Sequence, residues 1–281
     1  MTARQRIVAG TAATLTWQAV DQNGEPADPG TTTVAVAGSA GTVVLAAGTA
    51  TTTSGTARTV DIAAQSVDVL TVTWTGASRT ATTYVDVVGG VYFTSAQLRA
   101  DQPAVANEST HPLADIIEAR TITETMFDQR TDMAFVPRFA VLTTDRTARA
   151  RRTGIRSVKW AYTTAGAYIT DTTELADVVE VEQWGIACAA HIDRVGVVYG
   201  FDVPPADIKA VGMLYTRHLL AESAASGIDM RAILAQSPDG QAFGAFVPGR
   251  PRFITGIETV DAVLRAYTDH IPARSARIGG Y

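Results

Sequence analysis

The sequence predicts an α+β protein of two domains, an N-terminal all-β immunoglobulin-like sandwich followed by a domain of mixed helices and strands. Three observations support this fold class. Residues 1–90 contain 20 threonines and no lysine, in short alternating segments between turn residues. Beyond residue 90, apolar residues recur at helical spacing in several segments. The composition changes at Gly89-Gly90, which we interpret as a linker.

The N-terminal strands are predicted from apolar residues that alternate with polar ones, mostly threonine. Trp17 and Trp74 fall within such segments, so we expect both in the core. The residues Asp21-Gln22-Asn23-Gly24 predict a turn, because Asn and Gly tolerate positive φ. No cysteine pair is present, so the sandwich is immunoglobulin-like in architecture only. The predicted strands are 14–20, 33–36, 42–45, 59–62, 69–74 and 82–87.

Helices are predicted from capping signals and from apolar spacing. Thr94 and Gln97 have the spacing of a capping box. Pro112 then opens a longer helix, since proline fits the first helical turn. Ile122 and Met126 widen its apolar surface, and a helix with apolar residues on more than one side usually packs on two sides. Its main face is formed by Leu113, Ile116, Ile117, Arg120, Glu124 and Phe127.

The rest of the chain returns to strands and then ends in helices. Alternation predicts strands at 134–142, 155–160, 177–182 and 195–199. Pro204-Pro205 begins a second long helix with an apolar stripe of Ile208, Val211, Tyr215 and Leu219, and a short helix at 228–234 and a turn at 237–240 follow. A last helix is expected at 257–267, before a tail that needs a partner to become ordered. The predicted domains are therefore 1–90, 91–253 and 254–281.

Composition excludes several classes of protein. A formal net charge of −5 argues against a general nucleic-acid binder. The single cysteine, Cys188, excludes an intrachain disulfide and fits a reducing cytoplasm. No apolar run reaches the length of a membrane span, and Thr11, Thr14 and Thr16 interrupt the N-terminal apolar stretch, so we expect a strand there rather than a secretion signal.

Catalytic and metal-binding motifs are missing from the sequence. His111, His191, His218 and His270 have no ligand at metal-binding spacing, and no nucleophile elbow, phosphate-binding loop or dinucleotide fingerprint occurs. Cys188 lies among alanines and is expected to be a small buried residue rather than a nucleophile. We therefore predict a protein that is not an enzyme and has no cofactor or metal, although scattered carboxylates leave a paired acid and base possible.

Residues 146–159 form the one dense charge cluster. They include six basic residues and no acidic one. One interpretation is a solvated loop and strand face. The other is contact with DNA phosphates or with an acidic neighbouring subunit. The basic residues are Arg146, Arg149, Arg151, Arg152, Arg156 and Lys159.

The order of several segments after residue 90 resembles the head-to-tail adaptor (connector) proteins of long-tailed actinobacteriophages. The most specific is Tyr199-Gly200-Phe201-Asp202-Val203-Pro204-Pro205-Ala206-Asp207-Ile208-Lys209. The likeness covers about two-thirds of the chain, and the N-terminal sandwich resembles an accessory decoration. The other segments are 126–130, 134–138, 154–158 and 255–264.

This resemblance implies a helical-bundle adaptor domain with a β-rich insertion. It also implies a virion protein, assembled in the host cytoplasm, that forms a dodecamer ring at the neck. The ring would lie between the portal protein and a downstream neck or stopper protein, and double-stranded DNA would pass through its channel without specific recognition.

The C-terminal helix and tail are predicted to dock on the portal. The alternative is that the helix closes the chain's own core and that the tail has no role. The predicted docking residues are Val260, Val263, Leu264, Tyr267, Ile271, Ile278 and Tyr281.

Two other functions remain open at this stage. The chain resembles an adaptor, but a stopper or a tail terminator is an alternative within the same neck. A carbohydrate-binding or adhesive module is the alternative from another class, because the N-terminal sandwich permits it. An enzyme has no motif in its support.

Overall fold

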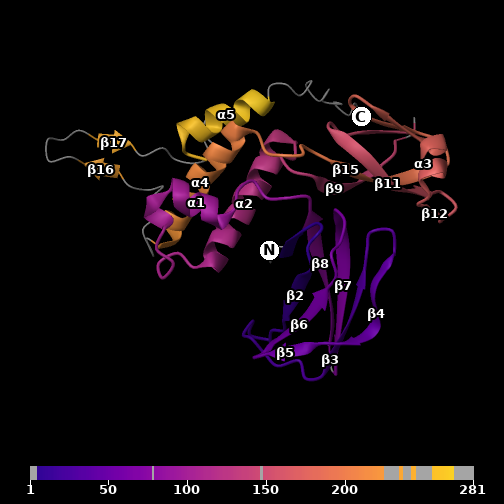
Figure 1. Cartoon of the computed structure of the whole chain (residues 1–281), viewed down its shortest axis with the longest axis horizontal. Helices are drawn as coiled ribbons and strands as arrows, with labels where there is room; N and C mark the ends of the chain where they lie inside the picture. The colour runs from indigo at the N-terminus through magenta and orange to yellow at the C-terminus, as the bar shows by residue number, and fades with distance from the viewer. Residues whose placement is uncertain are drawn as a thin grey trace, which may run out of the picture. The chain divides into compact units, whose positions relative to one another are not determined.

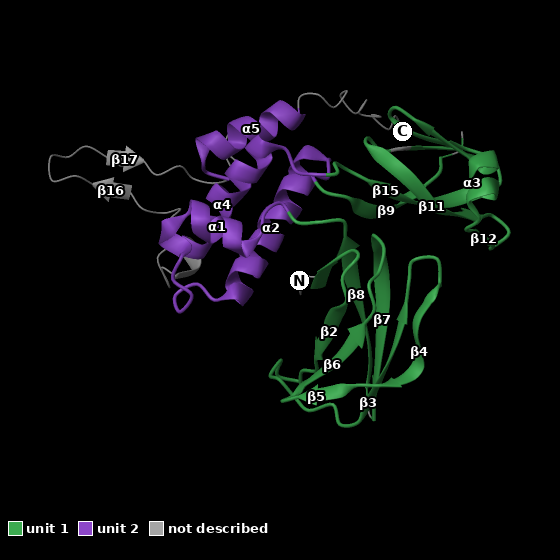
Figure 2. Ribbon diagram, in the orientation of Figure 1, with its two compact units in different colours: residues 1–91, 136–202 green, residues 92–135, 203–281 purple. Residues whose placement is uncertain are grey.

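The computed structural model describes residues 5–77, 79–145, 148–224, 234–236, 242–244 and 255–268. Its elements are shown in Figure 1. The chain forms two compact units, each made of two separate stretches (Figure 2). The first comprises residues 1–91 and 136–202, and the second comprises residues 92–135 and 203–281.

The N-terminal part of the first unit is a sandwich of two β-sheets. The larger sheet has the order β1-β8-β7-β3-β4, in which β1 runs parallel to β8 and the other pairs are antiparallel. The smaller has the order β2-β6-β5. The strands are β1 (Gln5–Val8), β2 (Ala13–Gln18), β3 (Thr32–Ala37), β4 (Val43–Ala50), β5 (Thr52–Ser54), β6 (Ala57–Ile62), β7 (Asp68–Gly76) and β8 (Thr80–Val88).

Alternating apolar residues build the core of the sandwich, as the sequence predicts. Leu15 and Trp17 of β2 point inward while their threonine neighbours are exposed. The ring of Trp17 stacks on Trp74 of β7, with centroids 5.8 Å apart. The indole Nε1 of Trp74 donates to the hydroxyl of Thr83 at 3.0 Å, so the buried polar group is satisfied. The prediction of an all-β N-terminal region is confirmed.

Two further sheets complete the first unit. The order of one is β12-β11-β15-β9, and that of the other is β10-β14-β13. Helix α3 (Thr172–Val178), which the sequence analysis missed, is capped by Asp171 through Thr173 N and Glu174 N. The strands are β9 (Arg138–Thr143), β10 (Arg149–Arg151), β11 (Ile155–Thr163), β12 (Tyr168–Ile169), β13 (Val179–Glu182), β14 (Gly185–Cys188) and β15 (Ile192–Tyr199).

The second unit contains most of the helices. Thr94 and Gln97 form the predicted capping box at the start of its first helix, with hydrogen bonds of 3.0 and 3.1 Å. The hydroxyls of Thr123 and Thr216 lie 2.9 Å apart in the buried contact between two helices. The described elements are α1 (Ser95–Asp101), the 3₁₀ helix η1 (Pro103–Val105), α2 (Leu113–Thr131), α4 (Ala206–Ala224), β16 (Leu234–Gln236), β17 (Ala242–Gly244) and α5 (Glu258–Thr268).

The predicted fold class is nevertheless wrong. The structure consists mainly of β-sheet, with seventeen strands and five α-helices in its described parts, and these parts contain no helical-bundle domain. Residues 136–202 lie between α2 and α4 in the chain, yet they group with the N-terminal sandwich. The resemblance implied a helical bundle with an inserted sheet. Instead, alternating β-branched residues within 136–202 form two sheets that share a hydrophobic core of their own. The expected helix at 228–234 and turn at 237–240 lie largely outside the described residues.

Gly89 makes a close packing contact with Pro137. Its backbone N–H donates to the carbonyl of Pro137 at 2.8 Å. A Cβ placed on Gly89 would lie 2.5–2.8 Å from the ring of Pro137, whereas one on Gly90 would come no closer than 3.9 Å to Val136. Gly89 therefore permits two backbone segments to approach closely.

This contact gives a matched pair of substitutions. Gly89→Ala should lower the free energy of unfolding by about 1–3 kcal/mol, because the new methyl group overpacks the Pro137 ring. Gly90→Ala should change it by no more than about 0.5 kcal/mol, since its methyl group finds ordinary space. Urea unfolding of the full chain measures both, and equal losses in the two variants would contradict the packing role.

Candidate functional site

The described residues hold no group of three or more histidine, cysteine or carboxylate side chains suited to a metal ion. Cys188 on β14 is half-buried, and burial raises the pKa of its thiol to about 11. A thiol with such a pKa is protonated near neutral pH and is a poor nucleophile. None of the described helices has the length and hydropathy needed to cross a membrane.

The histidines have ordinary structural positions. His111 is buried just before α2, and its carbonyl accepts a hydrogen bond from Arg99 at 3.0 Å. His191 is exposed, and His218 lies on α4 beside the ring of Tyr215. His270 lies outside the described residues.

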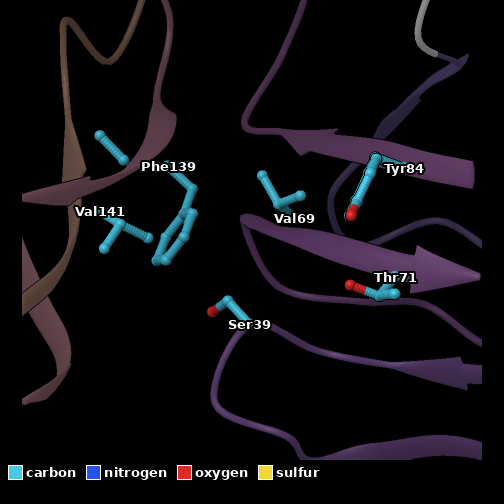
Figure 3. Close-up of a pocket in the computed structure, with 7 residues that line it drawn as sticks. Ser39, Val69, Thr71, Tyr84, Phe139 and Val141 are labelled. Carbon is cyan, nitrogen blue, oxygen red and sulfur yellow. The ribbon is translucent and has the colours of Figure 1, made fainter. Parts of the chain in front are cut away.

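A pocket of about 390 Å³ lies within the first unit (Figure 3). Residues of β7 and β8, with Ser39 from the turn after β3, form one side and three residues of β9 form the other. No carboxylate, imidazole or amine lines it, so the pocket has no acid–base pair. Its lining residues are Ser39, Val69, Thr71, Tyr84, Phe139, Ala140 and Val141.

The basic cluster of the sequence is divided among several places. The Arg156 guanidinium pairs with Asp202. The Arg152 guanidinium lies over the ring of Tyr199, 3.8 Å from the centroid. Arg146 lies outside the described residues. Arg152 and Arg156 therefore already have partners within the chain.

Lys159 joins β11 to the N-terminal sandwich. Its ammonium donates to the carbonyl of Val67 at 2.8 Å and to the hydroxyl of Ser66 at 3.0 Å. It also lies 3.6 Å from the carboxylate of Asp68, and both side chains are largely buried. Next to it, the Trp160 Nε1 donates to the hydroxyl of Ser39 at 2.8 Å.

A β-bulge lets the consecutive residues Lys159 and Trp160 both contact the N-terminal sandwich. Val158 pairs with Val197 and Trp160 pairs with Gly196, so Lys159 is an extra residue in β11. The ring of Trp160 lies directly on Gly196, where a Cβ would be only 2.3 Å from it. The sequence alone does not indicate this contact, because a regular strand places consecutive side chains on opposite faces.

Arg149 and Arg151 of the cluster belong to β10, the basic edge of a small sheet. β10 pairs with β14, and β14 pairs with β13, which carries Glu180 and Glu182. The Arg149 guanidinium lies 3.2 Å from the carboxylate of Glu182, and both side chains are more than one-third exposed. Arg149 is therefore an exposed member of the predicted contact region.

Helix α5 packs against helices of its own unit. Val260 and Leu264 are fully buried, Val263 is half-buried, and α5 contacts both α2 and α4. Burial of each fully enclosed side chain contributes about 1.5–3 kcal/mol to the unit's own stability. The alternative for this helix, closure of the chain's own core, therefore accounts for these positions. Docking by Ile271, Ile278 and Tyr281 stays a prediction, as all three lie outside the described residues.

Tyr267 completes the packing of α5. Its ring meets Phe135 edge to face, with centroids 5.0 Å apart. Its hydroxyl hydrogen-bonds to both carboxylate oxygens of Asp207, at 3.0 and 3.1 Å. Burial, together with the hydrogen bond and the charge of Asp207, raises the pKa of Tyr267 to about 12.

Known proteins give little further information. No family model and no curated protein matches the sequence. A chimeric titin Z1Z2–Z1Z2 tandem, functionalized with a GRGDS exogenous peptide from fibronectin, has 9% identity and a TM-score of 0.25, with 70% of this chain and 81% of that chain covered. Domains 5–6 of the S-layer protein SbsC have 14% identity and a TM-score of 0.22, with 70% and 79% covered. TM-scores this low do not establish a shared fold.

Lys159→Met should lower the free energy of unfolding by about 1–3 kcal/mol, because it leaves the largely buried Asp68 without its cation. The matched control is Lys209→Met, at the chain's other lysine, which should change the free energy by no more than about 0.5 kcal/mol. Urea unfolding of the full chain measures both. A loss from Lys159→Met that persists undiminished in an Asp68→Asn background would contradict the pairing.

Tyr267→Phe should change how stability depends on pH. The folded pKa of Tyr267 is raised, so its contribution is complete below about pH 10, the pKa of an unfolded tyrosine, and is lost as the pH rises toward 12. The wild-type chain should be the more stable protein at pH 8, and this advantage should shrink at pH 11. Urea unfolding at the two pH values tests this, and a constant difference would count against the Asp207 contact.

Proposed function

We propose that the chain is a non-catalytic structural subunit of the head-to-tail junction of a long-tailed phage. In this proposal twelve copies form a ring at the virion neck, between the portal and a downstream neck or stopper protein. The genome passes through the ring without sequence-specific recognition. The proposal concerns function and assembly, and it does not depend on a helical-bundle domain.

The observation that carries the proposal is the order of the adaptor-like segments. They recur along the chain from 126–130 to 255–264. The most specific segment leaves the first unit at Asp202 and enters the second at Val203. Within it, Gly200 N donates to the Gly154 carbonyl at 2.9 Å, which links it to a second adaptor-like segment, 154–158.

Helix α2 adds support for association with other chains. Ile116 and Phe127 are buried in the second unit, whereas Leu113, Ile117 and Ile122 are each more than 40% exposed. Apolar side chains on both the buried and the exposed sides suit a helix that packs twice, once within its own unit and once against a neighbour.

The distribution of charge suits passage of DNA better than retention. The net charge is −5, and Arg156 and Lys159 pair with Asp202 and Asp68 of the same chain. A surface that holds DNA tightly needs many cations free to neutralise phosphates. A neck ring must release the genome during infection, so weak attraction is the more useful property.

Cryo-electron microscopy of the virion neck tests the proposal. We expect a closed ring of this chain in contact with the portal. Depletion of the chain should yield filled heads without attached tails, and supplying the wild-type gene should restore attachment. A neck that lacks the chain, or holds it as one copy, would rule out the ring. A ring seated against the tail tube instead would favour a tail terminator.

A further inference from the structure

The outer face of the sheet β10-β14-β13 has opposite charges on its two edge strands. Ala150 and Val179 are buried, so the positions that alternate with them form the outer face. Two rows of residues cross this face, and each runs from an arginine through a small residue to a glutamate. The rows are Arg149, Ala187 and Glu180, and Arg151, Gly185 and Glu182. We call these six residues the charged face.

The Arg149 and Glu182 charges of this face are available to a partner. Arg149 is 61% exposed and Glu182 is 38% exposed, although their charged groups lie 3.2 Å apart. An exposed ion pair of this kind is weak, so its members can exchange partners at little cost.

An exposed tryptophan beside the charged face suits a protein interface. Trp184 lies next to Gly185, in the turn between β13 and β14, and is 48% exposed. The Trp184 carbonyl accepts a hydrogen bond from Arg152 N at 3.2 Å, which fixes this turn beside β10. Tryptophan and arginine together are typical of the residues that dominate binding at protein interfaces.

We infer that the charged face is the contact between neighbouring copies of this chain, with β10 of one copy meeting β13 of the next. The inference rests on the proposed ring. A head-to-tail contact joins two different surfaces of the same protein, and a closed ring satisfies every copy of both. Opposite charges at the two ends of one sheet supply two such complementary surfaces.

Two observations indicate how a neighbouring copy meets this face and why a copy suits it better than DNA. The outward N–H and carbonyl of Arg149 are already hydrogen-bonded to Asp145, at 3.1 and 2.9 Å, so the neighbour meets side chains there instead of adding a strand. The carboxylate of Glu182 lies 3.2 Å from the Arg149 guanidinium and would repel phosphates, so the face suits another copy better than DNA.

Charge-reversal variants of the full chain test the inference, in virions that receive the chain from a plasmid. Arg149→Glu with Arg151→Glu should lower the yield of ring-bearing necks roughly tenfold or more, because two acidic edges then meet. Glu180→Arg with Glu182→Arg should do the same with two basic edges. The yield is measured by cryo-electron microscopy and by infectious titre.

Two combinations of these variants distinguish a loss of charge pairing from a general loss of folding. The quadruple variant that exchanges the charges of the two strands should restore ring formation. Equal co-expression of the two double variants should also restore it, since each then meets an opposite edge. The control is Glu174→Arg with Asp177→Arg, which reverses two exposed carboxylates on α3, outside the charged face, and should leave the yield unchanged.

The outcomes distinguish this inference from the proposed function. If wild-type necks contain the ring and the two double variants assemble it normally, the charged face is not the contact. The same conclusion follows if both double variants fold, by circular dichroism, but neither combination restores the ring. If wild-type necks contain no ring of this chain, the proposed function itself fails.

Discussion

The first unit depends on the contact that two consecutive residues of β11 make with the N-terminal sandwich. Lys159 places its ammonium among three oxygen-bearing residues, and Trp160 reaches Ser39 with its indole N–H. The bulge at Lys159 makes this possible, because a regular strand would turn one of the two side chains away. Gly196 contributes by having no side chain where the Trp160 ring lies. The sheet β12-β11-β15-β9 thereby belongs to the same unit as the strands of the N-terminal sandwich.

Local patterns made parts of the fold predictable from the sequence. Alternating threonines and apolar residues predicted the sandwich, the Thr94–Gln97 spacing predicted a capping box, and Pro112 marked the start of α2. The fold class failed because it depended on which segments pack together, and that is decided by distant contacts such as those of Lys159 and Gly89. Short elements such as α3 were also missed, since seven residues give too little periodicity.

The candidate site was predictable only in part. A dense run of basic residues is visible in the sequence, but the partners of those residues are not. Asp202, Tyr199 and Asp68 lie far from the run in sequence, and they divide it into internal contacts. The acidic strand opposite β10 gave a signal in Glu180 and Glu182, yet only the register of β14 places the two strands on one sheet. The apolar face of the last helix was identified correctly, and its position in the chain's own core required the structure.

The alternation of the two units along the chain has a consequence for synthesis. The first unit is complete once Asp202 has left the ribosome, but α2 is made before that point and packs against α4 and α5, which follow it. Ile116 and Phe127 therefore remain uncovered while the strands of the middle region are being made and folded. An incomplete chain with such exposed apolar residues is prone to aggregate, and the second unit is the last part of the chain to fold. During translation a complete β-rich unit is therefore joined to a second unit that is still incomplete.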